Sequence, residues 1–408
     1  MQAPGEFVPG LARDATGSSR GESLPPPFWG SAPEAHQPLA ENPTPSGEDY
    51  LSRRIRLWRR IPAPSYDGVA LSVLGMSNIL VTGATGQIGS SLCRRLVEEG
   101  HNVTAFILPK TWHPFLDGLK LNIVYGNICN YEDVIKAMRG QDFVYQVAGI
   151  VSYSRLDHAK MYAVHCDGVR NVLTAAKECG VKKVVVTAST AGIGIPENKN
   201  QPLAENAPFD FKKYQRVMYM YSKHLKIKLC QEFAQKGLNV SIVSPTTVYG
   251  QGDMEMHVGK MVKKIKNGQL RSAPPGGNAV VSVDDVVDAH LLVMERGTSG
   301  ANYIFADECL TYFDMYNRIA KLLGAPPIRR ITPAWTLPFA KLFLSVKEHI
   351  LTWFGKKPSR SPHALNFSFK CRYFDSSKAR RELGWQSKVS FAEAMRKAIQ
   401  FYTERGLI

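Results

Sequence analysis

The sequence predicts a doubly wound α/β fold, in which helices cover both faces of a parallel β-sheet. From residue 78 onward, short apolar runs alternate with amphipathic helical stretches, as in strand-helix-strand repeats. The first apolar run ends in a glycine-rich turn that leads directly into a helical stretch. With 408 residues, 44% of them hydrophobic, the chain is long enough for one large or two ordinary domains.

We expect six strands in the main sheet, because six short apolar runs are bounded by turn-forming residues. They cover residues 78–82, 102–108, 121–125, 143–147, 183–187 and 239–244. Helices are expected to follow Gly86, Tyr131, His158, Tyr214 and Glu255. This order predicts a Rossmann domain over residues 76–250. A smaller C-terminal α/β region over residues 251–408 is expected to be partly interleaved with it.

Residues 1–75 are predicted to form a disordered extension, because they are rich in Pro, Gly and Ser and lack apolar periodicity. Acidic residues along the segment argue against a transit peptide, and no early apolar run indicates a signal peptide. The basic cluster at residues 53–60 suits a membrane or nucleic acid, but one cluster of this length does not predict specific binding to either. Met76 directly precedes the first strand, so we expect the upstream residues to have no catalytic role.

The net charge of +16 is unevenly placed, since residues 321–388 hold 14 Lys and Arg but only three acidic residues. A solvated basic face explains this bias most simply, and an anionic partner is the alternative. The seven cysteines are scattered and have no metal-ligand spacing. We therefore expect free thiols, no bound metal and a cytoplasmic location.

The most apolar helical stretch covers residues 337–354, but Lys341, Lys347 and Glu348 make it too polar for a membrane span. On a helix, six large apolar side chains would share one face: Phe339, Leu342, Phe343, Val346, Ile350 and Trp353. We expect this face to pack on its own domain. The alternatives are a lid over an apolar substrate pocket or peripheral contact with a membrane surface.

A dinucleotide site is predicted where the first strand meets the first helix. Gly83 and Gly86 allow a tight turn and close approach of a pyrophosphate to the backbone, and Gly89 allows close helix-strand packing. The strand-turn-helix context makes this motif far more specific than a glycine loop alone. Its remaining predicted cofactor contacts are Thr85, Gln87 and Ile88.

The end of the second strand bears on the choice between NAD and NADP. Leu108 stands there, so the carboxylate that usually holds the ribose 2′-hydroxyl of NAD is missing. Lys110, two residues later, carries a charge that suits a 2′-phosphate. We therefore expect NADP as the cofactor, with NAD as the alternative.

An acid-base pair is predicted at Tyr219 and Lys223, which lie four residues apart and so share one helix face. A cation held there would lower the pKa of the phenol and make Tyr219 a usable proton donor or acceptor. Ser189 follows the carboxyl end of a predicted strand, where doubly wound sheets bind their ligands. Its hydroxyl is placed to hydrogen-bond a substrate oxygen.

Taken together, these motifs resemble the extended branch of the short-chain dehydrogenase/reductase superfamily, over residues 77 to about 402. The chain is most similar to the group of dihydroflavonol reductases, 3-beta-hydroxysteroid dehydrogenases and hopanoid-associated sugar epimerases. The resemblance implies that Ser189, Tyr219 and Lys223 are catalytic, and that Lys223 also holds the nicotinamide ribose together with Tyr219. It further implies cofactor contacts at Asn127, Ile128, Ala148, Gly149, Pro245 and Val248.

The chain departs from the family pattern at several positions. His165 replaces an asparagine of the helix after the fourth strand, and Asn127 replaces an aspartate of the adenine motif. Residues 278–282 lack the arginine that grips the diphosphate in nucleotide-sugar enzymes, and Ser244 replaces the asparagine that often precedes Pro245.

The last two departures count against a nucleotide-sugar enzyme, and the lid-like apolar stretch at residues 337–354 suits an apolar substrate better. We therefore expect an NAD(P)-dependent oxidoreductase acting on an apolar ketone or alcohol of sterol, terpenoid or flavonoid type. The C-terminal region would then bind the substrate. The alternatives are an epimerase- or dehydratase-like enzyme of sugars and a non-catalytic cofactor-binding scaffold at a membrane. A homodimer is expected by analogy with the family.

Overall fold

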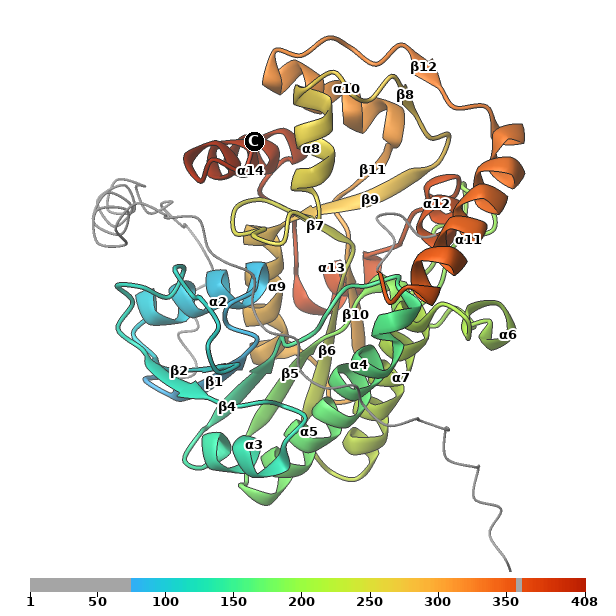
Figure 1. Cartoon of the computed structure of the whole chain (residues 1–408). Coiled ribbons are helices and arrows are strands. Elements are labelled where there is room, and N and C mark those ends of the chain that lie inside the picture. The colour runs from blue at the N-terminus through green and yellow to red at the C-terminus, as the bar shows by residue number, and fades with distance from the viewer. Residues whose placement is uncertain (1–74, 357–361) are drawn as a thin grey trace, which may run out of the picture. The chain divides into compact units, whose positions relative to one another are not determined.

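The computed structural model describes residues 75–356 and 362–408, which belong to one compact unit (Figure 1). Apart from Gly75, the predicted disordered extension and its basic cluster at residues 53–60 lie outside the described residues. Within the described part, the α/β prediction is confirmed: a parallel sheet carries helices on both faces (Figure 1).

The main sheet has the strand order β10-β6-β5-β4-β1-β2-β3, and every neighbouring pair is parallel. All six predicted strands are present, each with ends within one residue of those expected. They are β1 (Asn78–Thr82), β2 (Asn102–Ile107), β3 (Asn122–Tyr125), β4 (Phe143–Gln146), β5 (Lys183–Thr187) and β6 (Val240–Pro245). A seventh strand that the sequence did not predict, β10 (Asn302–Phe305), extends the sheet beside β6. Residues beyond 250 therefore help to build the nucleotide-binding sheet.

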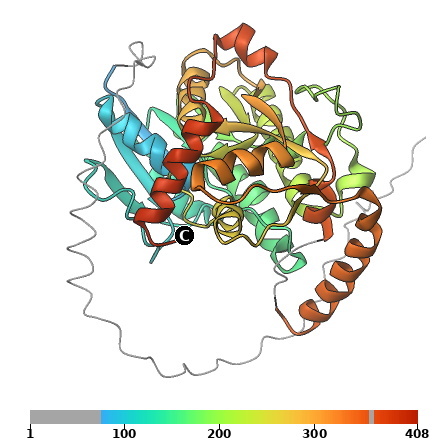
Figure 2. The same ribbon diagram turned by 90° about the horizontal axis from the view of Figure 1, so that it is seen from above.

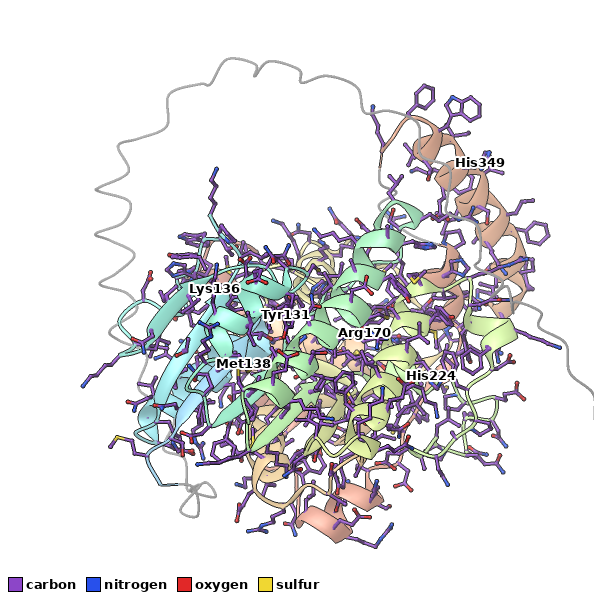
Figure 3. The ribbon with its side chains drawn as sticks, turned by 90° about the horizontal axis from the view of Figure 1, so that it is seen from below. Tyr131, Lys136, Met138, Arg170, His224 and His349 are labelled. Carbon is purple, nitrogen blue, oxygen red and sulfur yellow. The ribbon has the colours of Figure 1, made fainter. Side chains whose placement is uncertain are left out.

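Helices form a layer on each face of this sheet (Figure 1). One layer holds α2 (Gln87–Glu98), α9 (Val283–Arg296) and α13 (Ser377–Leu383), and the other holds α3 (Tyr131–Met138), α5 (Gly168–Glu178) and α7 (Met218–Gln235). Figure 3 shows the second layer, with Tyr131 on α3, Arg170 on α5 and His224 on α7. Two buried apolar clusters lie between the sheet and these layers.

The strand order reverses between β1 and β4, because β2 and β3 continue on one side of β1 while β4 lies on the other. Doubly wound sheets bind ligands at the carboxyl ends of their strands, at such a reversal. From β4 the chain leads to α4 (His158–Tyr162), which passes through one π-helical turn, Ala163–Asp167, into α5. The glycine turn after β1 and the loop after β4 are thus brought side by side.

A smaller sheet lies beyond the carboxyl ends of the main strands (Figure 1). It contains β7 (Thr247–Tyr249), β9 (Gly277–Ser282), β11 (Glu308–Thr311) and β13 (Cys371–Arg372), and a separate pair joins β8 (Ser272–Ala273) to β12 (Arg330–Ile331). Nearby helices are α8 (Gly259–Lys266), α10 (Tyr312–Leu323) and α14 (Phe391–Glu404). The short helices α6 (Phe211–Tyr214) and α12 (Pro362–Ser368) complete this side of the protein.

The buried carboxylate of Asp285 ties the C-terminal segment to the sheet. Its two oxygens accept hydrogen bonds from the Ser282 and Ser387 hydroxyls and from the backbone N–H groups of Lys388 and Val389, at 2.7–3.2 Å. The Trp385 indole, which is 1% exposed, donates to the Asp285 carbonyl oxygen over 3.3 Å. A single acidic residue therefore fixes the strand-to-helix junction before α9 and the chain leading to α14.

The apolar face of α11 (Leu337–Trp353) does not pack on its own domain, and the sequence-based expectation was wrong. The six residues of that face are 52–82% exposed, and the flanking Trp335 and Phe354 are 71% and 70% exposed. The side chain that the helix buries is the charged Glu348. Periodicity identified the apolar face but not which face turns inward, because Leu344 and Leu351 on the opposite side supply a second apolar contact surface. Among the described helices, none combines the length and apolarity needed to cross a bilayer.

Candidate active site

The turn between β1 and α2 has the shape that a pyrophosphate requires. Gly83 has φ +67°, and a Cβ there would lie 2.6 Å from the Ala148 Cα of the neighbouring loop. A Cβ on Gly89 would overlap the Gly83 carbonyl oxygen. Gly86 caps α2 and no side chain occupies its first N–H groups, so these remain available to an anion. The predicted glycines thus form a cradle that fits the diphosphate of NAD(P).

The other predicted residues of this turn line its edges. Thr85 and Ile88 are half-buried, and Ile88 packs on the apolar cluster below. The Gln87 amide donates to the carbonyl oxygens of Gly250 and Gln251 over 3.2 and 3.1 Å. Gln87 therefore fixes the glycine turn to the loop after β7.

At the far end of the cradle, Leu108 and Lys110 lie just beyond β2, and both are exposed. Lys110 has φ +60°, an uncommon conformation for a lysine. Asn127 is also exposed, and its side-chain oxygen accepts the Cys129 N–H over 3.0 Å, which leaves the amide NH₂ for an adenine edge. Ile128 is buried, so it supports this corner by packing.

Ala148 and Gly149 follow β4, and Gly149 lies near Lys223 of α7. The Ala148 N–H donates to the Thr82 hydroxyl over 3.2 Å, which joins the ends of β4 and β1. A Cβ on Gly149 would lie 3.4 Å from both the Lys223 Nζ and the His165 Nε2. Gly149 thus lies next to the Lys223 amine and the His165 ring, and its missing side chain leaves space beside them.

Ser189, Tyr219 and Lys223 come together at the carboxyl end of β5. The Ser189 hydroxyl is hydrogen-bonded to the Tyr219 phenol and also accepts the Ala191 N–H over 3.2 Å. The Lys223 Nζ lies 5.9 Å from the centroid of the Tyr219 ring and donates to the Ala188 carbonyl oxygen over 3.4 Å. Three residues separated by up to 34 positions in the sequence thus share one site, as the motifs predicted.

The electrostatics of this site differ from the sequence-based expectation. Burial raises the pKa of Tyr219, while its hydrogen bond to Ser189 and the charge of Arg372 lower that pKa. Lys223 is not among the groups that lower it, because burial and the nearby Lys226 ammonium hold the pKa of Lys223 well below its usual value. The sequence-based expectation was that Lys223 lowers the pKa of the Tyr219 phenol. In the structure, Ser189 and Arg372 lower it instead.

Pro245 and Val248 lie where the two sheets meet. Pro245 ends β6 and pairs with Phe305 of β10, and Val248 of β7 pairs with Val281 of β9. Pro245 is buried and Val248 half-buried. Both are close in sequence to the turn that carries the chain from the cofactor sheet to the smaller sheet.

The structure adds three residues that the sequence did not single out as site residues. His165, on the π-helical turn, is fully buried, accepts the Ile150 N–H at Nε2 over 3.2 Å and bonds the Ser222 hydroxyl at Nδ1 over 2.9 Å. Burial, with Lys223 and Lys226, lowers its pKa, so it stays neutral. Tyr153 stacks edge-on against Tyr219 with ring centroids 5.5 Å apart. Arg372 comes from β13, whose two residues gave no detectable strand pattern.

Comparison with known proteins identifies the family to which the chain belongs. A family model described as "NAD dependent epimerase/dehydratase family" matches residues 79–305. The chain belongs to this family. The match covers the glycine turn, the Ser189, Tyr219 and Lys223 group and the β6 end, and it confirms the resemblance that the motifs indicated. Members bind an NAD-type cofactor, for which the cradle is shaped.

Individual relatives span nearly the whole described part. The chain is 29% identical over 336 residues to "Sterol demethylase protein B" of Methylococcus capsulatus, covering 81% of this chain and 99% of that one. It is 28% identical over 333 residues to a "Putative dihydroflavonol 4-reductase" of Synechocystis sp., covering 80% and 95%. The crystal structure of gox2253 superposes with a TM-score of 0.71 at 27% identity, covering 81% and 99%.

Proposed function

We propose that the protein is an NAD(P)-dependent oxidoreductase that transfers a hydride between the nicotinamide and an apolar ketone or alcohol. The observation that carries the proposal is the hydrogen bond between Ser189 and Tyr219 at the carboxyl end of β5. It places two hydroxyl groups beside the cofactor cradle, where one substrate oxygen can accept from both. A bound NAD(P) supplies or accepts the hydride.

Each residue of the pair then has a distinct task. Ser189 holds and polarises the substrate oxygen. Tyr219 donates its phenolic proton to that oxygen during reduction, or accepts the alcohol proton during oxidation. The raised pKa of Tyr219 keeps the phenol protonated near neutrality, which suits reduction. Lys223, in the space left by Gly149, would hydrogen-bond the cofactor ribose.

An apolar substrate is supported by the walls next to Tyr219. Tyr153 contacts both Tyr219 and Phe367 edge-on, at 5.5 and 5.9 Å between ring centroids. On β9, Asn278 is buried against Thr247 and Ser282 caps α9, so residues 278–282 offer no cation to a diphosphate. The names of the relatives, a sterol and a dihydroflavonol protein, point in the same direction. A sterol, terpenoid or flavonoid-like compound fits best.

NADP is the preferred cofactor in this proposal, because no carboxylate stands at the end of β2 and Lys110 is exposed there. Lys110→Glu should lower the affinity for NADPH and leave that for NADH nearly unchanged or improved. Fluorescence titration of both cofactors tests this. Equal losses for the two cofactors would mean that Lys110 does not meet the 2′-phosphate.

Turnover is tested by following nicotinamide absorbance with a panel of sterol, flavonoid, aldehyde and nucleotide-sugar substrates. We expect NADPH consumption with an apolar ketone, and product analysis should show the matching alcohol. Conversion of nucleotide sugars alone, without added cofactor, would instead establish the epimerase-like alternative. Tyr219→Phe should abolish turnover while still binding NADPH.

We also propose that α11 places the enzyme on a membrane surface. Eight large apolar side chains of residues 335–354 are more than half exposed, and Figure 2 shows α11 at the margin of the protein. Figure 3 marks the same helix by His349, apart from the layer of α3, α5 and α7. Exposed Lys341, Lys347 and Lys356 lie on or beside this helix, and their charge suits anionic lipid.

Pelleting with phosphatidylcholine vesicles, with and without phosphatidylserine, tests this placement. The wild type should sediment with both kinds, more strongly with the anionic one, and Phe343→Glu should reduce sedimentation. Ile123→Ser, at an exposed apolar residue of β3, serves as the matched control and should have no effect. Unchanged sedimentation of Phe343→Glu would contradict membrane placement. A wild-type dimer that this substitution dissociates would also contradict it, and would indicate that a second copy covers this face.

A further inference from the structure

We infer that a cavity beside α11 binds the headgroup of a phospholipid that carries a primary ammonium group. Phosphatidylethanolamine, which combines this ammonium with a phosphate, is the ligand that the lining residues fit. The inference rests on the proposed membrane placement of α11 and names the lipid that the placement would select. It concerns the charged and polar residues at the edge of the exposed apolar face.

The cavity has a volume of about 400 Å³. Arg155, from the 3₁₀ turn Arg155–Asp157, lines one side, and the other lining residues belong to α11. Cavities of about 300–1,000 Å³ are typical of small-molecule sites. This one therefore has room for a lipid headgroup, and it is bounded by two elements that lie far apart in the sequence.

The cavity lies at the border between the apolar and polar faces of α11. Val346 and Ile350 line it and belong to the exposed apolar face, with 52% exposure each. Glu348 and Thr352, which lie four residues apart on another side of the helix, line it as well. A helix that lies on a membrane keeps such a border at the depth of the headgroups. A headgroup would thus meet the cavity while the acyl chains meet the apolar face.

Glu348 offers this cavity an acceptor that has no donor. The residue is 3% exposed, and its Oε1 is buried without a hydrogen-bond partner among the described residues. The Thr352 hydroxyl, one turn later, is also buried and unpartnered within the described part. Glutamate is almost never fully buried unless it is paired, because a carboxylate without donors is costly in the interior. A primary ammonium would bring the opposite charge and three N–H donors.

Arg155 supplies the charge that a phosphate needs. It is exposed, so its guanidinium is open to a ligand from the membrane side. It does not hydrogen-bond the Glu348 Oε1 across the cavity, because that oxygen has no partner. A guanidinium pairs with phosphate oxygens through parallel N–H bonds. The two walls thus carry opposite charges, which match the phosphate and the ammonium of a zwitterionic headgroup.

The same residues discriminate between headgroups. Phosphatidylcholine carries the same phosphate, but its quaternary ammonium has no N–H to donate to Glu348 or Thr352. Phosphatidylserine adds a carboxylate, which Glu348 would repel at short range. The exposed lysines of α11 respond to the net charge of a membrane, whereas this cavity would respond to the hydrogen-bond donors of one headgroup.

The cavity is close in the chain to the proposed substrate walls. Arg155 follows Tyr153 by two residues, and the Tyr153 ring contacts Tyr219 edge-on with 5.5 Å between centroids. Tyr153 also contacts Phe367 of α12, the helix against which α11 packs. A headgroup held in the cavity would therefore turn the substrate side of the protein towards the bilayer.

Calorimetric titration with short-chain lipids, below the concentrations at which they form micelles, tests the site without a membrane. The full chain is titrated with dihexanoyl phosphatidylethanolamine and with dihexanoyl phosphatidylcholine. We expect the wild type to bind the ethanolamine lipid about 10-fold more tightly, as for a charge-assisted hydrogen bond. Glu348→Gln should abolish this preference, because an amide carries no charge. Arg155→Gln should weaken the binding of both lipids by a similar factor, since both carry the phosphate.

Two further variants of α11 separate headgroup recognition from folding, and thermal unfolding of each variant checks that it is folded. Lys347→Gln removes an exposed charge beside Glu348 that does not line the cavity, and it should keep the preference. Thr352→Val removes the second acceptor with little change of shape, and it should reduce the preference about threefold.

The inference is overturned if the wild type binds the two lipids equally or binds neither. It is also overturned if Glu348→Gln keeps the preference, or if Lys347→Gln loses it as fully. If Glu348→Gln does not fold, Thr352→Val decides, and an unchanged preference in that variant would reject the site.

Failure of this inference is distinguishable from failure of the membrane placement, which is measured with vesicles and Phe343→Glu. Sedimentation that Phe343→Glu reduces, without a preference between the two soluble lipids, would keep the placement and remove the headgroup site. A preference for the soluble ethanolamine lipid, without sedimentation of the wild type, would keep the site and remove the placement. Turnover of an apolar ketone tests the oxidoreductase independently of both.

Discussion

Replacing Ser189 with alanine removes a single hydroxyl that serves both the proposed reaction and the local fold. The hydroxyl is hydrogen-bonded to the Tyr219 phenol, lowers the pKa of that phenol and would hold the substrate oxygen. It also accepts the Ala191 N–H over 3.2 Å. Loss of that last contact should cost about 0.5–1.5 kcal/mol of folding free energy, which leaves the fold intact.

The effect on catalysis should be much larger than the effect on stability. Removing one donor to an oxygen that develops charge costs about 100-fold to 1,000-fold in kcat. The pKa of Tyr219 should also rise, since burial then acts with less opposition. In alcohol oxidation Tyr219 must lose its proton to act as a base, so the limb of the pH profile that rises with pH should move to higher pH.

Steady-state oxidation and reduction measured over a range of pH, together with NADPH titration, check this reasoning. Cofactor affinity should stay within about twofold of wild type, because Ser189 faces the substrate. Ser189→Thr keeps a hydroxyl and should retain much of the activity. An Ala variant with less than about fivefold loss in kcat and an unmoved pH limb would refute the role given to Ser189.

Three further predictions concern stability and cofactor binding. Gly83→Ala should lower Tm and NADPH affinity more than Gly180→Ala. Both glycines have φ near +67°, but of the two only Gly83 is crowded, by Ala148. Thermal unfolding and NADPH titration of the two variants measure the difference. Fully buried Lys226 has its pKa lowered by burial from 10.5 to about 8, so its ammonium destabilises the fold below pH 8 and this cost fades as pH rises towards 10.5. Lys226→Met should therefore gain up to about 3 kcal/mol in urea unfolding at pH 7 and much less at pH 10. Asp285→Ala should lose at least about 3 kcal/mol, seen as a lower Tm, since four donors lose their acceptor together.

Local patterns were sufficient to predict six of the seven strands of the main sheet and the proximity of Ser189, Tyr219 and Lys223. Six strands are short apolar runs between turn residues, and the glycine turn has a spacing that few other structures use. Ser189, Tyr219 and Lys223 follow from their places after a strand and on one helix face. These features depend on neighbours in sequence, so they are readable without a structure.

Long-range contacts escaped prediction for physical reasons. The edge strand β10 is four residues long and follows α9, so its pairing with β6 is not encoded locally. Arg372 reaches the site because β13, two residues long, pairs with β9, which is almost 100 residues earlier in the chain. The outward apolar face of α11 also could not be read, since both faces of that helix carry leucines. Which face of a helix is buried depends on the elements that pack against it, and the periodicity of the helix does not identify those elements.

Transfer of deuterium from the cofactor tests directly whether the protein is a hydride-transfer enzyme. Wild-type protein is incubated with an apolar ketone and NADPH or NADH deuterated at the transferring carbon of the nicotinamide, and the product is examined by mass spectrometry. We expect an alcohol with deuterium on the former carbonyl carbon, and no labelled alcohol with Tyr219→Phe. A product without deuterium, or equal labelling by Tyr219→Phe, would contradict hydride transfer at this site.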